Sequence, residues 1–346
     1  MKKNETLWVD FIRVVAIFSV VWLHSAAPLL YKYNEIPHLD WWAGNVYDSI
    51  VRMCVPLLFM ISGYLLLGKQ EPLKMYAVKR INKVVVPLII WTIFYVFWRY
   101  YDTGRFIALK NVFGLLLNPA YYHLWFLYAL IGLYLYIPIL RILIQHASKE
   151  ILYYFVALWF VAVSVFPLIF RLSHIGNSYN LDMISGYVGY LVIGYLLGGL
   201  HIDKKWFVWS LVSAFVFAVI TMAGTFFLIV RYEGVYDEYF YSYLSPNVIL
   251  LSISVFVSLK YLTDKVITSE RGESILGSLS SVSFGIYFVH PMVLSAIGKG
   301  WLGTPFDVFS NSAIYSVPLL AILTFGISFV ITFILQRIPI VRKSVP

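Results

Sequence analysis

One long apolar segment, residues 7–30, reads LWVDFIRVVAIFSVVWLHSAAPLL. Arg13 lies near one end of this segment, and His24 lies eleven residues deeper. An ionisable residue at the centre of a membrane helix costs roughly 2.5–3.5 kcal/mol, so a simple lipid anchor would use leucine at these positions. Eleven residues make about three helical turns, which puts the two side chains on one face roughly 16 Å apart. This spacing favours one long ligand with a charged end and a reactive end.

The composition is that of a polytopic membrane protein. Of the 346 residues, 61% are hydrophobic and 12% are charged, and the mean hydropathy is +0.81. Soluble domains usually contain about 45–50% apolar and about 25% charged residues. The net charge of +9 would suggest nucleic acid as a partner of a soluble protein. Here the basic residues lie in short loops between apolar runs, so we expect the lipid bilayer as a partner and no nucleic acid.

Disulfide and metal chemistry are not expected. The single cysteine, Cys54, lies in an apolar run, and no Cys/His spacing typical of a metal site occurs. The histidines at membrane depth lack partners at i+4, and no mid-membrane carboxylate accompanies them, so we predict no metal. The first segment resembles a signal peptide, but Asp10 and Arg13 interrupt its apolar core. We therefore expect a retained first helix.

Ten segments are long enough to cross a bilayer at roughly 20 residues each. We predict an all-α, polytopic helical bundle that forms a single membrane-embedded domain over residues 1–346, in the cell (cytoplasmic) membrane. With both termini cytoplasmic, 18 of the 26 basic residues lie on the inner side, which fixes the expected orientation. The predicted spans are 8–30, 46–67, 84–101, 122–144, 151–170, 183–200, 207–230, 247–262, 282–298 and 313–335.

Two inner loops are predicted, at 68–83 and 263–281, and the first of them has a helical pattern. Pro72 suits the first position of a helix, and apolar residues then recur at helical spacing between Lys74, Lys79, Arg80 and Lys83. The pattern predicts a basic helix that lies on the inner membrane surface. It would either bind anionic lipid or hold phosphate groups beside Arg13, and the residues alone leave both open.

Further ionisable residues are placed at membrane depth. Arg52 lies near the outer end of the second span, His123 begins the fourth, and His290 lies well into the ninth. Counted from the inner side, His24 and His290 have comparable depths. A neutral histidine can remove a proton from a hydroxyl at working pH. A single such histidine is more often structural, but three histidines with a buried arginine favour a polar cavity inside the bundle.

Four motifs occur along the chain: Asp10-Phe-Ile-Arg13 with ten residues before His24, Val55-Pro56-Leu57-Leu58-Phe59-Met60-Ile61-Ser62-Gly63-Tyr64, Tyr122-His123-Leu124-Trp125-Phe126, and Ser283-Phe284-Gly285-Ile286-Tyr287-Phe288-Val289-His290-Pro291. With these motifs the chain resembles, over essentially its whole length, the membrane acyltransferase 3 family of integral-membrane O-acyltransferases of surface polysaccharides. Within the family the chain is similar to the group that includes the enterobacterial common antigen O-acetyltransferase, which implies the inner membrane of a bacterial cell. The chain departs from the family at Arg80-Ile81-Asn82-Lys83, where the family often has Arg-x-x-Arg, and lysine lacks the two-pronged guanidinium that matches phosphate.

The resemblance implies a mechanism. Acetyl-CoA or another acyl-CoA would enter from the cytoplasm, and Arg13, Arg80 and Lys83 would hold its phosphates. His24 would act as a general base on a glycan hydroxyl or carry the acyl group transiently, and the sequence does not separate these routes. Arg52 would stabilise an oxyanion, and His123 would take part in catalysis. The residues assigned to the acceptor, a glycan or lipid-linked saccharide, are Trp125, His290 and Tyr64.

The alternative function is transport of a small polar solute. Related membrane modules are fused to vancomycin-resistance serine racemases, where they resemble amino-acid uptake domains. Transporters tend to have internal repeats and paired broken helices, and the sequence predicts neither. The distance between Arg13 and His24 also suits a long ligand better than a small one.

Overall fold

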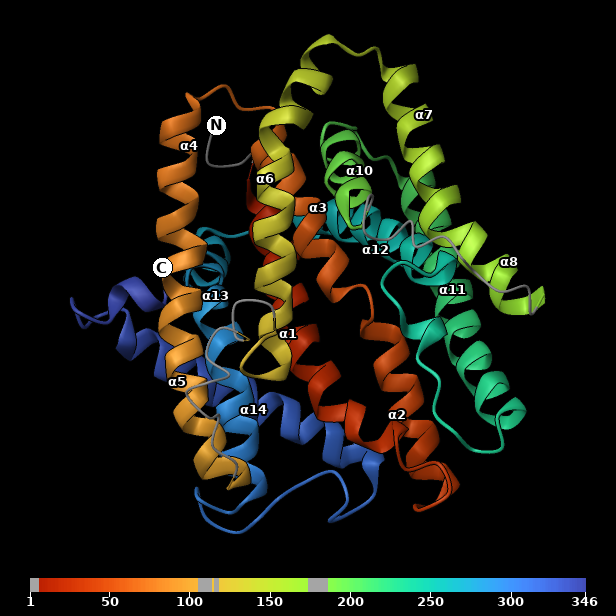
Figure 1. The fold of residues 1–346 in the computed structure, drawn as a ribbon, viewed down its shortest axis with the longest axis vertical. Coiled ribbons are helices and arrows are strands. Elements are labelled where there is room, and N and C mark those ends of the chain that lie inside the picture. The colour runs from red at the N-terminus through yellow and green to blue at the C-terminus, as the bar shows by residue number, and fades with distance from the viewer. Residues whose placement is uncertain (1–5, 105–113, 115–117, 174–185) are drawn as a thin grey trace.

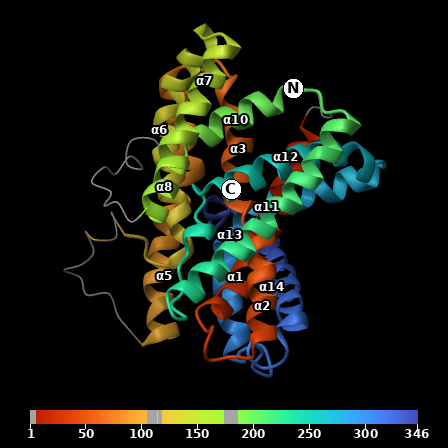
Figure 2. The ribbon, with the colours of Figure 1, turned by 90° about the vertical axis from the view of Figure 1, so that its right-hand side faces the viewer.

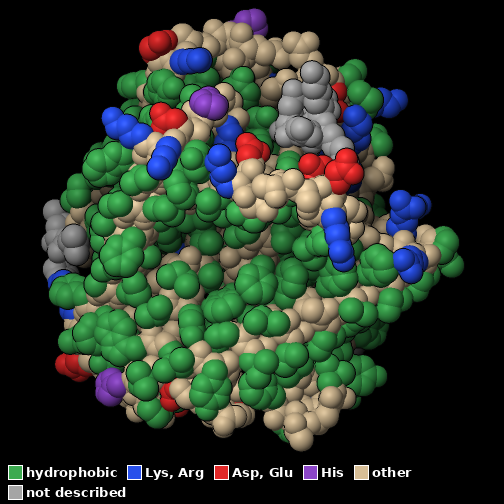
Figure 3. All heavy atoms as spheres, turned by 180° about the vertical axis from the view of Figure 1, so that it is seen from behind, with side chains coloured by type: hydrophobic (Ala, Val, Ile, Leu, Met, Phe, Trp, Pro, Cys, Tyr) green, Lys and Arg blue, Asp and Glu red, His purple; other side chains and the backbone are tan. Residues whose placement is uncertain are grey.

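A computed structural model describes residues 6–104, 114, 118–173 and 186–346, and all regular structure in these ranges is helical. Nine of the described helices are long and apolar enough to cross a membrane. On the face shown in Figure 3, charged side chains gather toward the upper end, and a broad apolar band lies beneath them. The prediction of an all-α, multi-pass membrane protein is confirmed.

Helix α1 (Leu7–Leu30) lies at the centre of the bundle (Figures 1 and 2). Thirteen of its residues are buried, spread along its whole length from Trp8 to Leu30. Arg13 and His24 are therefore held between helices, which agrees with a functional role for both. The helices that pack against α1 are α2 (His38–Val51), α3 (Cys54–Leu67), α12 (Pro246–Val266), α13 (Glu270–Gly298) and α14 (Ala313–Leu335).

The second span is broken, which the sequence analysis did not predict. Helix α2 ends at Val51 and α3 begins at Cys54, with Arg52 and Met53 between them. Pro56 explains the break, because proline has no N–H to donate to the carbonyl of Arg52 four residues earlier. The span begins at His38, before the predicted start at residue 46, and it ends at Leu67 as predicted.

The basic segment after Pro72 is helical, as predicted, but it does not form a separate helix. Helix α4 (Leu73–Arg80), a π-helical turn (Ile81–Val85) and α5 (Val86–Thr103) follow one another without interruption. They form one long rod at the side of the bundle (Figure 1). The span predicted at 84–101 is therefore the second half of a 31-residue helix.

The ninth span also begins earlier than predicted. Helix α13 starts at Glu270, where the Ser269 side chain caps it by accepting a hydrogen bond from the Gly272 N–H at 3.1 Å. Residues 270–281, expected to belong to a loop, form its first three turns. Serines and glycines lower the hydropathy of these turns and hide their helical character.

Helix α10 (Val188–Gly198) falls in the span predicted at 183–200, of which residues 183–185 lie outside the described ranges. It packs closely on α3, because Gly63 and Gly194 allow the two backbones to touch. A Cβ atom on Gly194 would lie 1.9 Å from the carbonyl oxygen of Met60, and one on Gly63 would lie 2.0 Å from that of Leu191. Only glycine fits at this crossing.

The remaining predicted spans agree with the structure to within a few residues. Helix α6 (Trp125–His146) follows a 3₁₀ turn (Tyr122–Leu124), and α7 (Lys149–Phe160) continues through a π-helical turn (Val161–Val165) into α8 (Phe166–Ser173). Helix α11 (Lys204–Arg231) packs along α12. The arrangement leaves α1, α13 and the start of α6 as the elements around the candidate site.

Candidate active site

Three histidines from three separate elements meet inside the bundle. His24 Nδ1 on α1 lies 2.8 Å from His290 Nε2 on α13. The two rings are nearly parallel, 5.1 Å apart with an interplanar angle of 4°. His123, from the 3₁₀ turn before α6, places its ring edge-on to His290 at 5.5 Å. The prediction that His24 and His290 share a depth is confirmed, and the structure adds direct contact.

The three rings differ in burial. His290 and His123 are 0% and 1% exposed, whereas His24 is partly exposed. Both ring nitrogens of His123 are enclosed and have no hydrogen-bond partner. Buried polar atoms in native proteins are nearly always hydrogen-bonded, so His123 retains two unused positions for a ligand or a water molecule.

Aromatic rings enclose His123. Tyr95 and Tyr287 lie 4.9 and 5.3 Å from its ring, and Tyr121 and Tyr122 lie 5.9 and 5.7 Å away. The Tyr287 hydroxyl donates a hydrogen bond to the His123 carbonyl at 2.5 Å. Together these contacts fix the turn that presents His123 to the other two histidines.

Asp102, near the end of α5, fastens this turn to α13. Its carboxylate accepts hydrogen bonds from the Tyr121 hydroxyl at 2.9 Å and from the Ser295 hydroxyl, and it pairs with Lys299 at 3.0 Å. The sequence analysis missed Asp102, because one acidic residue at the predicted end of a span has the appearance of an ordinary interfacial residue. Its three partners come from distant positions that no local pattern reveals.

A cavity of about 490 Å³ contains all three residues predicted to bind phosphate. Arg13 on α1, Arg80 on α4 and Lys83 in the π-helical turn line it together. Ile17, one turn after Arg13, also lines the cavity, whereas His24 does not. Phe126 and Tyr287 belong to its wall as well. Tyr287 contacts Phe126 at 5.5 Å and His123 at 5.3 Å, so the wall of the cavity is continuous with the ring cluster around His123.

The two arginines of the cavity have different partners. Arg13 binds the Asp10 carboxylate at 2.6 Å and the Ser280 hydroxyl at 2.5 Å, and Ser280 also bonds Asp10 at 2.6 Å. Arg80 instead lies over the rings of Tyr76 and Tyr134, at 5.5 and 5.6 Å. Its Nε is buried and has no partner. Among the described residues Arg80 has no carboxylate partner, so its charge is not neutralised by an acidic side chain at the cavity.

Glu71 holds the α3–α4 connection against α6. Its carboxylate pairs with Lys79 at 2.9 Å and with Arg141 at 3.0 Å. Hydrogen bonds from Lys79 and Arg141 lower the pKa of Glu71 from its ordinary value of 4.5 to about 2. Arg141 is itself buried and also donates to the Leu66 carbonyl at 2.8 Å. This network sets the angle at which α4 presents Arg80.

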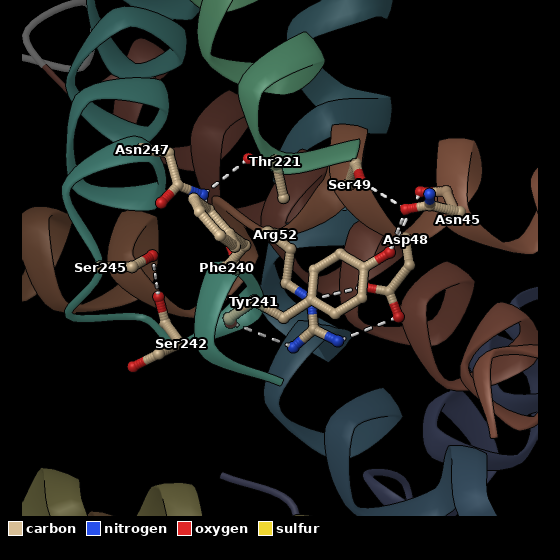
Figure 4. Close-up of polar contacts among 10 residues, drawn as sticks. All are labelled: Asn45, Asp48, Ser49, Arg52, Thr221, Phe240, Tyr241, Ser242, Ser245 and Asn247. Carbon is tan, nitrogen blue, oxygen red and sulfur yellow. Dashed lines mark hydrogen bonds and ion pairs between the residues drawn. The ribbon is translucent and has the colours of Figure 1, made fainter. Parts of the chain in front are cut away.

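Arg52 lies at the break between α2 and α3, in the polar cluster drawn in Figure 4. Two of its nitrogens bond the two carboxylate oxygens of Asp48, which is fully buried. Its guanidinium lies over the Tyr241 ring at 4.3 Å and the Tyr243 ring at 5.9 Å. Arg52 is therefore already paired with a carboxylate, and it does not line the cavity described above.

The other two predicted acceptor residues have separate partners. Trp125, two residues after His123 in the chain, stacks on Tyr243 at 5.7 Å with an interplanar angle of 21°. Tyr64 on α3 packs against Trp8 of α1 at 4.7 Å and does not line the cavity. Trp125 is therefore close to His123 along the chain, whereas Tyr64 is not.

The described residues form no cluster that could bind a metal ion. There, no set of three or more His, Cys, Asp or Glu side chains has the geometry to hold an ion. The nitrogens that His24 and His290 turn toward each other are engaged in their mutual hydrogen bond. The arrangement therefore offers acid–base and nucleophilic groups beside a cationic cavity.

The sequence was compared with protein families, curated proteins and solved structures. Residues 6–334 match the acyltransferase 3 family, described as an acyltransferase domain. No curated protein and no solved structure matches the chain. The family match favours an enzyme over the solute transporter considered from the sequence. Because it covers nearly the whole chain, this protein belongs to the acyltransferase 3 family and is a multi-pass membrane O-acyltransferase.

Proposed function

We propose that the enzyme transfers an acetyl group from cytoplasmic acetyl-CoA to a hydroxyl of a cell-surface or lipid-linked glycan. The observation that supports this most strongly is the single cavity shared by Arg13, Arg80 and Lys83. CoA combines several phosphates with a long thin arm that ends in the thioester. Three cations at one end of a cavity that runs along α1 suit such a ligand. The resemblance to the enterobacterial common antigen group makes a lipid-linked glycan the first acceptor to test.

The donor would reach the histidines along α1. Arg13 and Ile17 line the cavity on one face of this helix, and His24 lies on the same face, roughly 16 Å beyond Arg13. Tyr287 and Phe126 line the cavity, and Tyr287 also contacts His123, so these rings would lie between the cavity and His24. The arm of acyl-CoA must therefore pass these rings, and rotation of the Tyr287 side chain would open the way.

His24 supplies the chemistry in this proposal. In the direct route, His24 accepts the proton of the glycan hydroxyl while its oxygen attacks the thioester carbonyl. The C–S bond then breaks, and the CoA thiolate takes the proton back from His24. In the second route, the lone pair of the His24 ring attacks the thioester carbonyl and the C–S bond breaks. The N-acyl imidazolium loses its remaining ring N–H proton to the CoA thiolate, which leaves as the thiol. The glycan oxygen then attacks the acyl group, the N–acyl bond breaks, and the hydroxyl proton passes to the imidazole. Both routes give an O-acyl ester and free CoA.

The acceptor would bind beside His123 and Trp125. The unpartnered nitrogens of His123 can accept or donate hydrogen bonds to sugar hydroxyls. Trp125, two residues after His123, stacks on Tyr243, and this aromatic pair would extend the acceptor surface. Arg52 would act here through its contacts with Tyr241 and Tyr243, which hold residues 239–243 over this end of the site.

The test uses purified protein in lipid nanodiscs with radiolabelled acetyl-CoA and lipid-linked glycan fractions. We expect label on a glycan with the native protein, and none with His24→Ala. His146→Ala is the matched control, because His146 is exposed at the end of α6. Normal transfer by His24→Ala would contradict the role of His24, and absence of transfer to every glycan would contradict the choice of acceptor.

The orientation of the chain completes the proposal. We infer from the inner-side excess of basic residues that both termini are cytoplasmic. The only cysteine, Cys54, is buried, so single cysteines introduced at Lys343 and at Glu35 report accessibility without background. Labelling of Lys343→Cys by an impermeant reagent from outside intact cells would contradict the inferred orientation.

A further inference from the structure

The hydrogen bonds of His290 determine which of its nitrogens has the hydrogen atom. His290 Nδ1 lies 3.2 Å from the carbonyl oxygen of Ile286, one helical turn earlier. A carbonyl oxygen only accepts hydrogen bonds, so Nδ1 must be the donor. The ring is fully buried, and no described carboxylate is bonded to it, which favours the neutral form. In neutral imidazole the other nitrogen, Nε2, then has a lone pair.

The position of the hydrogen on His290 determines the tautomer of His24. His24 Nδ1 lies 2.8 Å from His290 Nε2, and two lone pairs cannot face each other at that distance. His24 Nδ1 therefore donates its hydrogen to His290, which leaves His24 Nε2 with the lone pair. Among the described residues, none bonds that Nε2. It is also absent from the enclosed atoms that lack partners, whereas both nitrogens of His123 are among them.

We propose that His290 is a positioning residue, which fixes the tautomer and the ring orientation of His24 so that Nε2 is the reactive nitrogen. This differs from the acceptor-binding role expected from the sequence, and it rests on the proposed function of His24. A carboxylate has the same task in serine-hydrolase triads, where it orients the catalytic imidazole. Here a second histidine takes its place, which avoids a permanent negative charge in the middle of a membrane.

No other orienting group is available near His24 among the described residues. Asp10, the nearest acidic residue on α1, lies roughly 21 Å away along the helix and is bonded to Arg13 and Ser280. The Tyr122 ring contacts His24 edge-on at 5.0 Å but makes no hydrogen bond to it within the described residues. The orientation of His24 therefore depends on the single bond to His290.

His24 and His290 together can also hold the proton of the glycan hydroxyl during the reaction. When His24 Nε2 takes the hydroxyl proton, the imidazolium keeps its Nδ1–H bond to His290. That hydrogen can shift to His290 Nε2, so the positive charge is shared by two rings. When the CoA thiolate leaves, the proton returns from Nε2 to the sulfur, and both rings regain their starting tautomers. No further proton donor is needed.

The test is ¹⁵N NMR of histidine-labelled protein in nanodiscs, with the His24 signals assigned by difference from His24→Gln. We expect the Nδ1–H tautomer of His24 in the native protein. His290→Gln retains an acceptor oxygen and should preserve this tautomer, whereas His290→Leu should lose it. Acyl transfer should fall about 10- to 100-fold in kcat for the leucine variant, as for other groups that orient a reactive side chain, with the KM for acetyl-CoA unchanged. The control on the same helix is Met292→Leu.

Two results would overturn the proposal. One is a native spectrum in which His24 has its hydrogen on Nε2. The other is persistence of the Nδ1–H tautomer in a folded His290→Leu protein, which would mean that another group orients the ring. Absence of acyl transfer in a native protein with the expected tautomer would instead contradict the proposed function and leave the tautomer assignment standing.

Discussion

Arg80 should contribute more to donor binding than Arg13, although both line the same cavity. Arg80 lines the cavity and has no carboxylate partner among the described residues, so a bound phosphate would gain the full benefit of a charge-assisted hydrogen bond. Such a bond is worth about 1.5–3 kcal/mol, which corresponds to about 10- to 150-fold in affinity. Arg13 is already bonded to Asp10 at 2.6 Å, and its side chain is 29% exposed. Its net contribution should be nearer that of a surface pair, about 1 kcal/mol or fivefold.

The assay is binding of a non-reactive thioether analogue of acetyl-CoA to protein in nanodiscs, measured by calorimetry at fixed salt. Arg80→Ala should weaken binding about 10- to 150-fold, and Arg13→Ala about fivefold. Lys74→Ala is the matched control, because Lys74 is exposed on the same helix and does not line the cavity. The reasoning is refuted if Arg80→Ala binds the analogue as well as Lys74→Ala does.

Three further changes test the surrounding structure. Lys83→Arg restores the two-pronged donor typical of the family, so the calorimetric affinity for the analogue should rise severalfold. Asp48→Asn leaves the charge of Arg52 buried and unpaired. In a denaturation assay this change should lower the free energy of unfolding by about 3–5 kcal/mol. As a control, Ser-to-Ala changes nearby should lower it by only about 1 kcal/mol. Glu71 has a pKa lowered from 4.5 to about 2, so its ion pairs should stabilise the fold fully above pH 4.5 and less as the pH falls toward 2. Melting temperatures of Glu71→Gln should not show this loss.

The spans were predictable because hydropathy and length alone identify them, and the exceptions have local causes. The basic residues of Leu73–Arg80 lower the hydropathy of a segment that is nevertheless continuous with α5. The serines after Ser269 do the same at the start of α13. The break at Arg52 follows from Pro56, whose position in the sequence signals a missing hydrogen bond but not whether the helix bends or stops.

The site was predictable only as far as spacing along one helix allows. Helical periodicity placed Arg13 and His24 on one face, and depth counting placed His290 level with His24. Which side chains are in contact depends on how the helices pack. The ion pair of Arg52 with Asp48 and the ion pair of Asp102 with Lys299 could therefore not be predicted from the sequence. The catalytic and binding roles assigned to these residues stay predictions until the experiments above are done.

The two rings at the wall of the cavity, Phe126 and Tyr287, have a consequence for the cell as well as for the enzyme. Under the proposed function, a donor on one side of the bilayer and an acceptor on the other need polar surfaces on both sides, and a continuous wet path between them would conduct protons. Phe126 and Tyr287 contact each other at the cavity wall, and Tyr287 also contacts His123, so we expect these two rings to interrupt that path. Replacing both with alanine should therefore collapse a pH gradient across proteoliposomes, whether or not any acceptor is present.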